Sequence, residues 1–264
     1  MNENAAGGWV KVIGLGPGDA TYLTVEAQAA LDAATDLIGY SPYVARVPER
    51  EGLARHATDN RVEVDRARHA LQLAMTGHRV AVVSGGDPGV FAMASAVFEA
   101  VDTGDAGWRT LDIEVIPGIS AMQAASARLG AMLGGDFCAI SLSDNLKSWD
   151  IIATRLEAVA VADFVISLYN PASKARPDRI FDAFTLLRRI KPADTIIVLA
   201  KSVGRPEEAI LITTLSQVDV AAIDMSTLVM IGSSQSRRIA KPDGGAWVYT
   251  RRFVPVQAEA DAAR

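Results

Sequence analysis

The chain has 264 residues, of which half are hydrophobic and 22% are charged, and its formal net charge is −5. This composition is typical of a soluble globular protein with a sizeable core, and the acidic balance disfavours a general nucleic-acid binder. No apolar run reaches the roughly 18–20 residues of a membrane helix, and the N-terminus lacks a basic-then-apolar signal pattern. We therefore expect a cytoplasmic protein with no membrane segment and no nucleic-acid partner.

Metal-binding and disulfide chemistry find little support in the sequence. Cys138 is the only cysteine, so an intrachain disulfide is impossible and a thiolate metal cluster is strongly disfavoured. His69 lies in a helical pattern and His78 follows it by a turn. We expect surface or packing roles for both histidines, and we predict no metal site.

The first half of the chain alternates short β-branched runs, Gly/Pro turns and helical patterns. This order favours a largely parallel sheet that helices cover on both faces. Strands are predicted over 10–13, 80–83 and 113–116, and helices over 24–34, from the 84–89 turn through residue 100, and over 120–129.

The second half is more mixed. Strands are predicted over 137–142, 164–168, 195–199 and 227–231, an antiparallel strand over 209–214, and a hairpin turn at Asp243-Gly244-Gly245. With a junction near Pro117, the chain divides into an N-terminal α/β domain over 10–117 and a C-terminal α/β domain over 118–254. Residues 1–9 are expected to be disordered, and residues 255–264 form a frayed tail.

The first Gly-rich turn, Gly14-Leu-Gly-Pro-Gly-Asp19, departs from a dinucleotide fingerprint. Asp19 stands where the third glycine belongs, and Pro17 removes an N–H that would hold a phosphate. No Walker-type lysine follows the turn. The turn therefore suits a cofactor without phosphates, although a purely structural role is the alternative.

Two further turns follow predicted parallel strands. In Ser84-Gly-Gly-Asp-Pro-Gly-Val-Phe91, the glycines permit close approach of a ligand, and Asp87 either caps the next helix, binds a cationic cofactor, or does both. In Pro117-Gly-Ile-Ser120, the serine either caps a helix or contacts a ligand. Open α/β sheets bind ligands where parallel strands end, so three such turns predict a binding site.

These three motifs, in this order, resemble those of the tetrapyrrole methylases, the class III methyltransferases, over about residues 10–254. Further segments are similar to the precorrin-3B C17-methyltransferases within that family. They are Ala34-Thr-Asp-Leu-Ile-Gly-Tyr40 with Tyr43-Val44, Ile140-Ser-Leu-Ser-Asp-Asn-Leu146, Leu168-Tyr-Asn-Pro-Ala-Ser-Lys-Ala-Arg176, and Gly204-Arg-Pro-Glu-Glu208.

The resemblance implies a homodimer of chains with two α/β domains, mainly parallel sheets and a cofactor cleft between the domains. It also implies methyl transfer from S-adenosylmethionine to C17 of a tetrapyrrole, with ring contraction, in cobalamin synthesis. A cobalt-bearing substrate, or another methylase of the family such as a precorrin-4 C11-methyltransferase, remains an alternative. Carried over by position, the cofactor contacts are Pro17, Gly85, Gly86, Asp87, Val90, Ser120, Ala121, Asn170 and Thr227.

Catalytic and substrate-binding residues are less well defined. Asp19, Ser84, Asp144 and Tyr169 carry titratable or polar groups and are the candidates for a proton relay, with no argument that singles out one of them. Because the substrate carries many carboxylates, cations are expected near it, and arginine binds carboxylates in a bidentate way. The candidates for this role are Arg46, Lys174 and Arg176.

Overall fold

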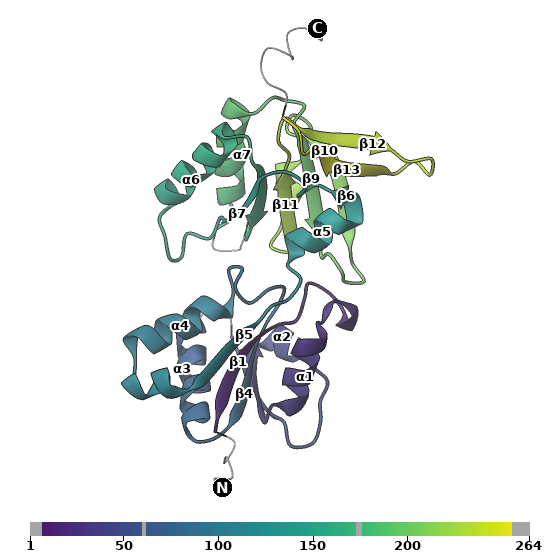
Figure 1. Cartoon of the computed structure of the whole chain (residues 1–264). Helices are drawn as coiled ribbons and strands as arrows, with labels where there is room; N and C mark the ends of the chain where they lie inside the picture. Colours follow the sequence, from purple (N-terminus) through teal and green to yellow (C-terminus); the bar gives the residue numbers. More distant parts are fainter. Residues whose placement is uncertain (1–6, 60–61, 173–175, 255–264) are drawn as a thin grey trace. The chain divides into compact units, whose positions relative to one another are not determined.

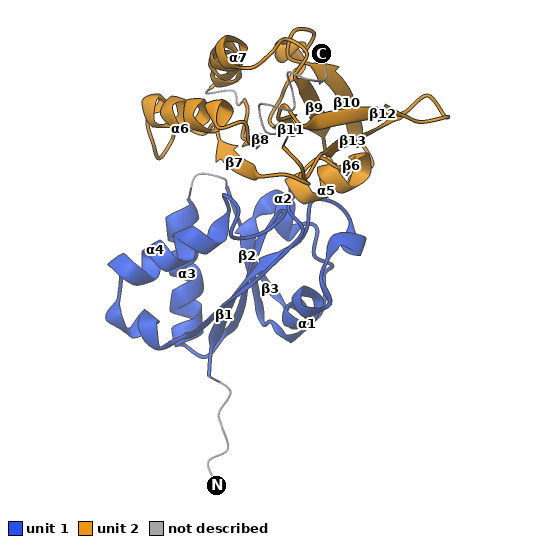
Figure 2. Ribbon diagram, turned by 45° about the horizontal axis from the view of Figure 1, so that its top comes forward, with its two compact units in different colours: residues 1–121 blue, residues 122–264 orange. Residues whose placement is uncertain are grey.

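The computed structural model describes residues 7–59, 62–172 and 176–254. The chain forms two compact units, residues 1–121 and 122–264, and the division lies close to the junction expected near Pro117 (Figure 2). The expected frayed tail and most of the expected disordered N-terminus lie outside the described residues. Trp9 already belongs to the first strand.

Unit 1 is built on a parallel sheet with the strand order β3-β2-β4-β1-β5. Figure 1 labels β1, β4 and β5 of this sheet, and Figure 2 labels β2 and β3. Its strands are β1 (Trp9–Gly14), β2 (Asp36–Tyr40), β3 (Ala54–Thr58), β4 (Arg79–Ser84) and β5 (Asp112–Ile116). All strand pairs of this sheet within the described residues run parallel, which confirms the prediction for the first half of the chain.

Helices cover both faces of the unit 1 sheet. Because successive strand residues point to opposite faces, each strand contributes side chains to both layers. Val10 and Val12 of β1 pack in the cluster with α3 (Glu63–Met75) and α4 (Met93–Thr103). Ile13 packs on the opposite face with α1 (Val25–Ala33) and α2 (Ser41–Val44). The start of α1 is fixed by Thr24, whose hydroxyl accepts a hydrogen bond from the Ala27 N–H at 3.1 Å.

The sheet of unit 2 has the order β10-β9-β11-β8-β7. Its strands are β7 (Phe137–Ser141), β8 (Val165–Tyr169), β9 (Ile196–Lys201), β10 (Ala209–Thr214) and β11 (Thr227–Ile231). On one face, α6 (Trp149–Val161) and α7 (Arg179–Ile190) pack through a buried cluster that includes Phe184.

The prediction of mainly parallel strands is corrected for unit 2. Only β7 and β8 pair in parallel, whereas β11 lies antiparallel to both β8 and β9, and β10 is antiparallel to β9. The segment 202–208 between β9 and β10 is too short for the crossover that a parallel pair requires. The expectation of an antiparallel strand over 209–214 is confirmed.

A small second sheet completes unit 2. It consists of β12 (Ser236–Ala240), β13 (Ala246–Thr250) and β6 (Gly130–Ala131), which follows α5 (Ala121–Leu129). The predicted turn joins β12 and β13, and the Asp243 side chain there accepts a hydrogen bond from the Gly245 N–H at 2.9 Å. The Thr250 hydroxyl donates to the Met132 carbonyl at 2.7 Å and ties this sheet to the segment after α5.

Candidate functional site

Three loops meet where the parallel strands β4, β1 and β5 end, and this region of unit 1 is here called the carboxyl edge. It comprises residues 14–19, 84–91 and 117–120. The Leu15 N–H donates to the Ser84 carbonyl at 2.9 Å, and Gly16 and Gly86 exchange two backbone hydrogen bonds of 3.2 and 2.9 Å. The first two Gly/Pro turns are therefore joined directly, and the third contacts both of them through Gly118.

Glycines let these loops pack backbone against backbone. A Cβ atom on Gly118 would lie 2.5 Å from the Gly86 carbonyl oxygen, and one on Gly14 would lie 2.7 Å from the Gly118 nitrogen. Gly86 differs, because a Cβ atom there would meet nothing closer than the Ser120 Cα at 3.8 Å. Gly86 also has a φ of 70°, which favours glycine. A Cβ atom at this distance would be in ordinary van der Waals contact, so the backbone conformation rather than crowding accounts for glycine here.

Asp87 joins the second loop to the third. Its Oδ1 accepts a hydrogen bond from the Gly89 N–H at 2.8 Å, and its Oδ2 accepts one from the Gly118 N–H at 3.0 Å. The alternative in which Asp87 caps the following helix is wrong. The N-cap of α4 is Ala92, and the Met93 N–H instead donates to the Ser84 hydroxyl at 3.3 Å.

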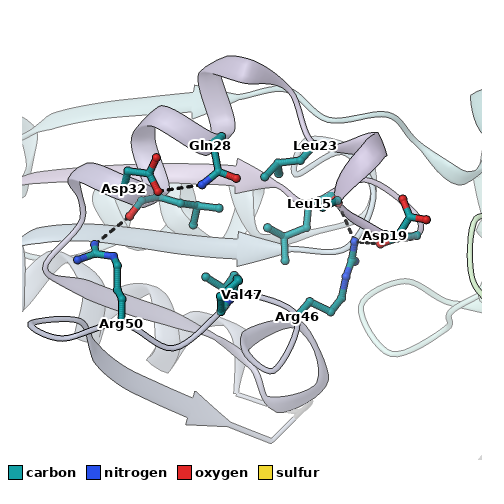
Figure 3. A pocket seen from close by; sticks show the side chains of 12 residues that line it. Leu15, Asp19, Leu23, Gln28, Asp32, Arg46, Val47 and Arg50 are labelled. Atoms are coloured by element: carbon teal, nitrogen blue, oxygen red, sulfur yellow. Dashed lines mark hydrogen bonds between the residues drawn. The ribbon is translucent and has the colours of Figure 1, made fainter.

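The first loop borders a pocket of about 290 Å³ (Figure 3). Its apolar lining includes Leu15, Leu23, Leu31 and Val47, and its polar lining includes Asp19, Gln28, Asp32, Arg46 and Arg50. Asp19 accepts a hydrogen bond from the Thr21 N–H at 2.9 Å and so caps the short helix that follows.

Arg46, a predicted substrate contact, holds the first loop in place. Its guanidinium donates to the Leu15 carbonyl at 2.7 Å, to the Gly16 carbonyl at 3.0 Å and to the Gly18 carbonyl. This geometry supports a role in shaping the loop, and a contact with substrate stays a prediction.

The structure brings together seven of the predicted cofactor contacts on unit 1. Pro17 and Ser120 are buried, and the others are half-buried. These seven residues are Pro17, Gly85, Gly86, Asp87, Val90, Ser120 and Ala121. A Cβ atom on Gly85 would lie 2.7 Å from the Tyr43 ring, so Gly85 makes room for this aromatic side chain.

Asn170 and Thr227 are the two predicted cofactor contacts on unit 2. They lie at the same end of its central strands, where β8 ends and β11 begins. Asn170 has a φ of 52°, and its amide donates to the Ser141 hydroxyl at 2.9 Å. Thr227 is buried, and its hydroxyl donates to Asp224 at 2.9 Å. Left-handed backbone is unusual outside glycine and marks Asn170 as a position under constraint.

Among the catalytic candidates, Tyr169 lies next to Asn170, and its hydroxyl accepts a hydrogen bond from the Met122 N–H at 3.1 Å. The hydrogen bond from Arg179 at 2.7 Å lowers the pKa of Asp144 and holds it as a carboxylate. Ser84 is 1% exposed, with its hydroxyl directed to the start of α4. These contacts support structural roles for Ser84 and Asp144.

The predicted substrate cations after β8 are only partly described. Lys174 lies outside the described residues. Arg176 forms an ion pair with Asp144 at 3.4 Å, and 13% of its side chain is exposed. Its guanidinium also donates to the Leu142 carbonyl at 3.4 Å.

A cluster that the sequence reasoning missed lies at the opposite end of the unit 1 sheet, here called the amino edge. His56 and His78 contact the buried Asp36 carboxylate at 2.9 and 2.7 Å, and His69 lies 3.2 Å from His56. The expected surface or packing roles understate these contacts. No local motif signals them, because the histidines come from β3, α3 and the turn before β4.

Within the described residues, no group of three or more histidine, cysteine or acidic side chains is placed to hold a metal ion. No helix in the described part of the chain combines the length and the apolar character needed to cross a bilayer.

Comparisons with known proteins bear on this geometry. The model of the family "Tetrapyrrole (Corrin/Porphyrin) Methylases" matches residues 10–219. A precorrin-3B C(17)-methyltransferase from Sinorhizobium sp is 49% identical over 93% of this chain and 97% of the relative.

Two solved structures are also similar. The methyltransferase CobJ has a TM-score of 0.88 and 50% identity, over 92% of this chain and all of that chain. A uroporphyrin-III C-methyl transferase from Thermus thermophilus, complexed with S-adenyl homocysteine, has a TM-score of 0.65 and 20% identity, over 85% of this chain and 97% of that chain. Because the family model covers most of the chain and a relative of similar length is 49% identical, the chain belongs to the tetrapyrrole methylases.

Proposed function

We propose that this chain transfers a methyl group from S-adenosylmethionine to C17 of precorrin-3B, with contraction of the ring to precorrin-4, in cobalamin synthesis. The observation that carries the proposal is the 49% identity to a precorrin-3B C(17)-methyltransferase over nearly the full length of both chains. The similarity to CobJ at a TM-score of 0.88 supports it further.

The carboxyl edge supports a donor without phosphates. Pro17 has no N–H for a phosphate, and Asp19 and Asp87 would repel one. When bound, S-adenosylmethionine supplies a methyl group that its sulfonium has already activated. The protein then has to hold the donor and the carbon nucleophile in line and to exclude water.

We assign positioning to the backbone of the carboxyl edge. The glycine contacts and the two hydrogen bonds of Asp87 hold the loops together, and Gly86, which has no side chain, is proposed to let the ligand approach the backbone. Each oxygen of a carboxylate has two lone pairs, so Asp87 retains acceptor capacity for the amine of the donor. Asn170 and Thr227 are proposed as further cofactor contacts, and Asp19 and Tyr169 are the candidates for proton transfer.

The decisive experiment is mass spectrometry of the product formed with an isotopically labelled methyl donor. We expect one labelled methyl group on precorrin-3B and contraction of the ring. The cobalt-bearing counterpart serves as the second substrate, and faster turnover of it would replace the metal-free assignment. A wild-type chain that methylates neither compound would refute the proposal. We also propose that the chain is a cytoplasmic homodimer. Light scattering tests the dimer, because it measures the mass of the particle in solution.

Arg176 provides a test of substrate recognition. If it binds a substrate carboxylate, Arg176→Ala raises the KM for the tetrapyrrole and leaves donor affinity unchanged. Asp144→Asn is the matched control, because it removes the same ion pair and keeps the cation. An equal rise in KM in both variants would make Arg176 a structural residue instead.

A further inference from the structure

Phe91 has a backbone conformation that a bulky residue rarely adopts. Its φ is 54°, in the left-handed region. The side chain of a phenylalanine crowds the backbone there, whereas glycine does not, so this conformation costs free energy. Strained residues of this kind are concentrated at functional sites.

The protein core does not account for the strain. Phe91 is 49% exposed and lies outside the buried cluster that includes its neighbour Met93. A second phenylalanine a few residues later provides a comparison. Phe98 on α4 has the same side chain and is 50% exposed, yet it lies in ordinary helix. Exposure of the ring therefore does not require the left-handed backbone.

Hydrogen bonds fix the segments on both sides of Phe91. Before it, the Val90 N–H donates to the Asp87 carbonyl at 3.3 Å, and Asp87 is itself bound to Gly89 and Gly118. After it, the Ala94 N–H donates to the Pro88 carbonyl at 3.0 Å. Phe91 is thus held between the clamped turn and the start of α4, at the carboxyl edge.

The other aromatic side chains near this edge are more enclosed. Tyr43 packs over Gly85 and contacts the Tyr40 ring edge-on, with the centroids 5.5 Å apart. Both tyrosines are only partly exposed. Phe91 is the only aromatic residue within the loops at 14–19, 84–91 and 117–120, and it is more exposed than the two tyrosines.

We propose that the Phe91 ring packs against one of the pyrrole-derived rings of the tetrapyrrole and is a substrate-binding residue. This inference rests on the proposed function and adds a named contact to it. Aromatic rings bind flat π-systems by offset stacking. A residue that keeps about half of its surface exposed suits a wide ligand whose carboxylate periphery stays hydrated. The left-handed backbone then serves to hold the ring at the edge where the donor binds.

The test compares Phe91→Gly, Phe91→Ala and Phe91→Tyr with Phe98→Ala as the matched control. The KM and kcat for precorrin-3B are measured, together with its dissociation constant from enzyme loaded with S-adenosylhomocysteine. Calorimetry gives the donor affinity, and thermal unfolding gives the stability. Phe91→Gly is the central variant, because glycine removes the ring and accepts the left-handed backbone without strain.

We expect Phe91→Gly to raise the KM and the dissociation constant for the tetrapyrrole about tenfold, with donor affinity retained. Its melting temperature should equal or exceed that of the wild type. Phe91→Ala should lose the same substrate affinity and melt lower, since alanine keeps the strain. Phe91→Tyr should restore substrate binding, and Phe98→Ala should resemble the wild type.

Unchanged tetrapyrrole binding in an active Phe91→Gly variant would overturn the inference. So would a loss confined to donor affinity, which would place the ring against the adenine. A loss of equal size in Phe98→Ala would also overturn it. These failures differ from failure of the proposed function, in which the wild-type chain itself neither binds nor methylates the tetrapyrrole.

Discussion

The two ends of the unit 1 sheet are held together by different kinds of contact. At the carboxyl edge, Gly14, Gly86 and Gly118 pack backbone against backbone, and Asp87 accepts two backbone N–H groups. At the amino edge, the buried Asp36 carboxylate contacts the His56 and His78 imidazoles and accepts a hydrogen bond from the Thr35 hydroxyl.

This difference separates binding from stability within one sheet. The glycines allow the three loops of the carboxyl edge to pack closely, and this is where we propose that the ligand approaches the backbone. Side chains fill the amino edge, where the 3% exposed Asp36 needs partners because burying an unpaired charge is costly. Changes at the carboxyl edge should therefore alter ligand binding, and changes at the amino edge should alter stability alone.

The largest effect is expected for Gly118→Ala. The added Cβ atom would meet the Gly86 carbonyl oxygen at 2.5 Å, and backbone on both sides cannot yield easily. We expect a loss of about 3 kcal/mol in unfolding free energy, at the upper end for overpacking, together with loss of donor binding. Denaturant unfolding and calorimetry measure the two. Gly7→Ala, where nothing lies within 4 Å, is the control. Wild-type stability in Gly118→Ala would contradict the packing argument.

Asp36→Ala should sharpen the contrast from the other end of the sheet. The change leaves His56, His78 and Thr35 without their common acceptor, and we expect a loss of about 2–3 kcal/mol in unfolding free energy. Calorimetry at a temperature where the variant is folded should show unchanged donor affinity. Weaker donor binding in this variant would break the proposed separation between the two edges.

Asp87→Ala should act mainly on the ligand. Loss of a charge-assisted contact is expected to weaken donor binding by about 1–3 kcal/mol. Asp87→Asn is the control, because its one carbonyl oxygen can keep the bond to Gly118 or Gly89 but not both. Calorimetry that gives wild-type affinity for both variants would reject a cofactor role for Asp87.

The smallest effect is a pH dependence at the amino edge. Burial, together with the neighbouring His56, lowers the pKa of His69 from its usual value of 6.5. Below pH 6.5 the unfolded chain then binds more protons than the folded chain, so stability is full above this pH and falls as the pH drops. His69→Gln should flatten this part of the curve, which denaturant unfolding between pH 5 and 8 measures. An unchanged slope would exclude His69 as its source.

Protonation of Asp36 also lowers the stability of the folded chain, at a lower pH than protonation of His69. Burial opposes the charged form, but the contacts with His78, His56 and Thr35 outweigh it and lower the pKa of Asp36. Its stabilising contribution is therefore present above the usual carboxyl range and is lost as the pH falls through the folded pKa.

Much of the fold could be predicted because its signals are local. The runs ending at Ile13, Val83 and Ile116 are each followed by a Gly/Pro turn, and all three are strands of the parallel sheet. In unit 2 the position of β11 was predicted, but its direction between β8 and β9 was not. Strand direction depends on pairing between distant segments, which hydrophobic patterning leaves open.

The amino-acid sequence alone determined most strand positions of the two larger sheets, the Gly/Pro turns that follow β1, β4 and β5, and the resemblance to a methylase family, because these depend on neighbouring residues. Tertiary structure decided that Asp87 binds Gly118 rather than capping α4, that His56 and His78 contact Asp36 while His69 contacts His56, and that Phe91 is held with a φ of 54°. The first two depend on groups that are distant in sequence and that only the folded backbone brings within hydrogen-bonding distance. The third depends on neighbouring segments that hold the backbone against its local preference.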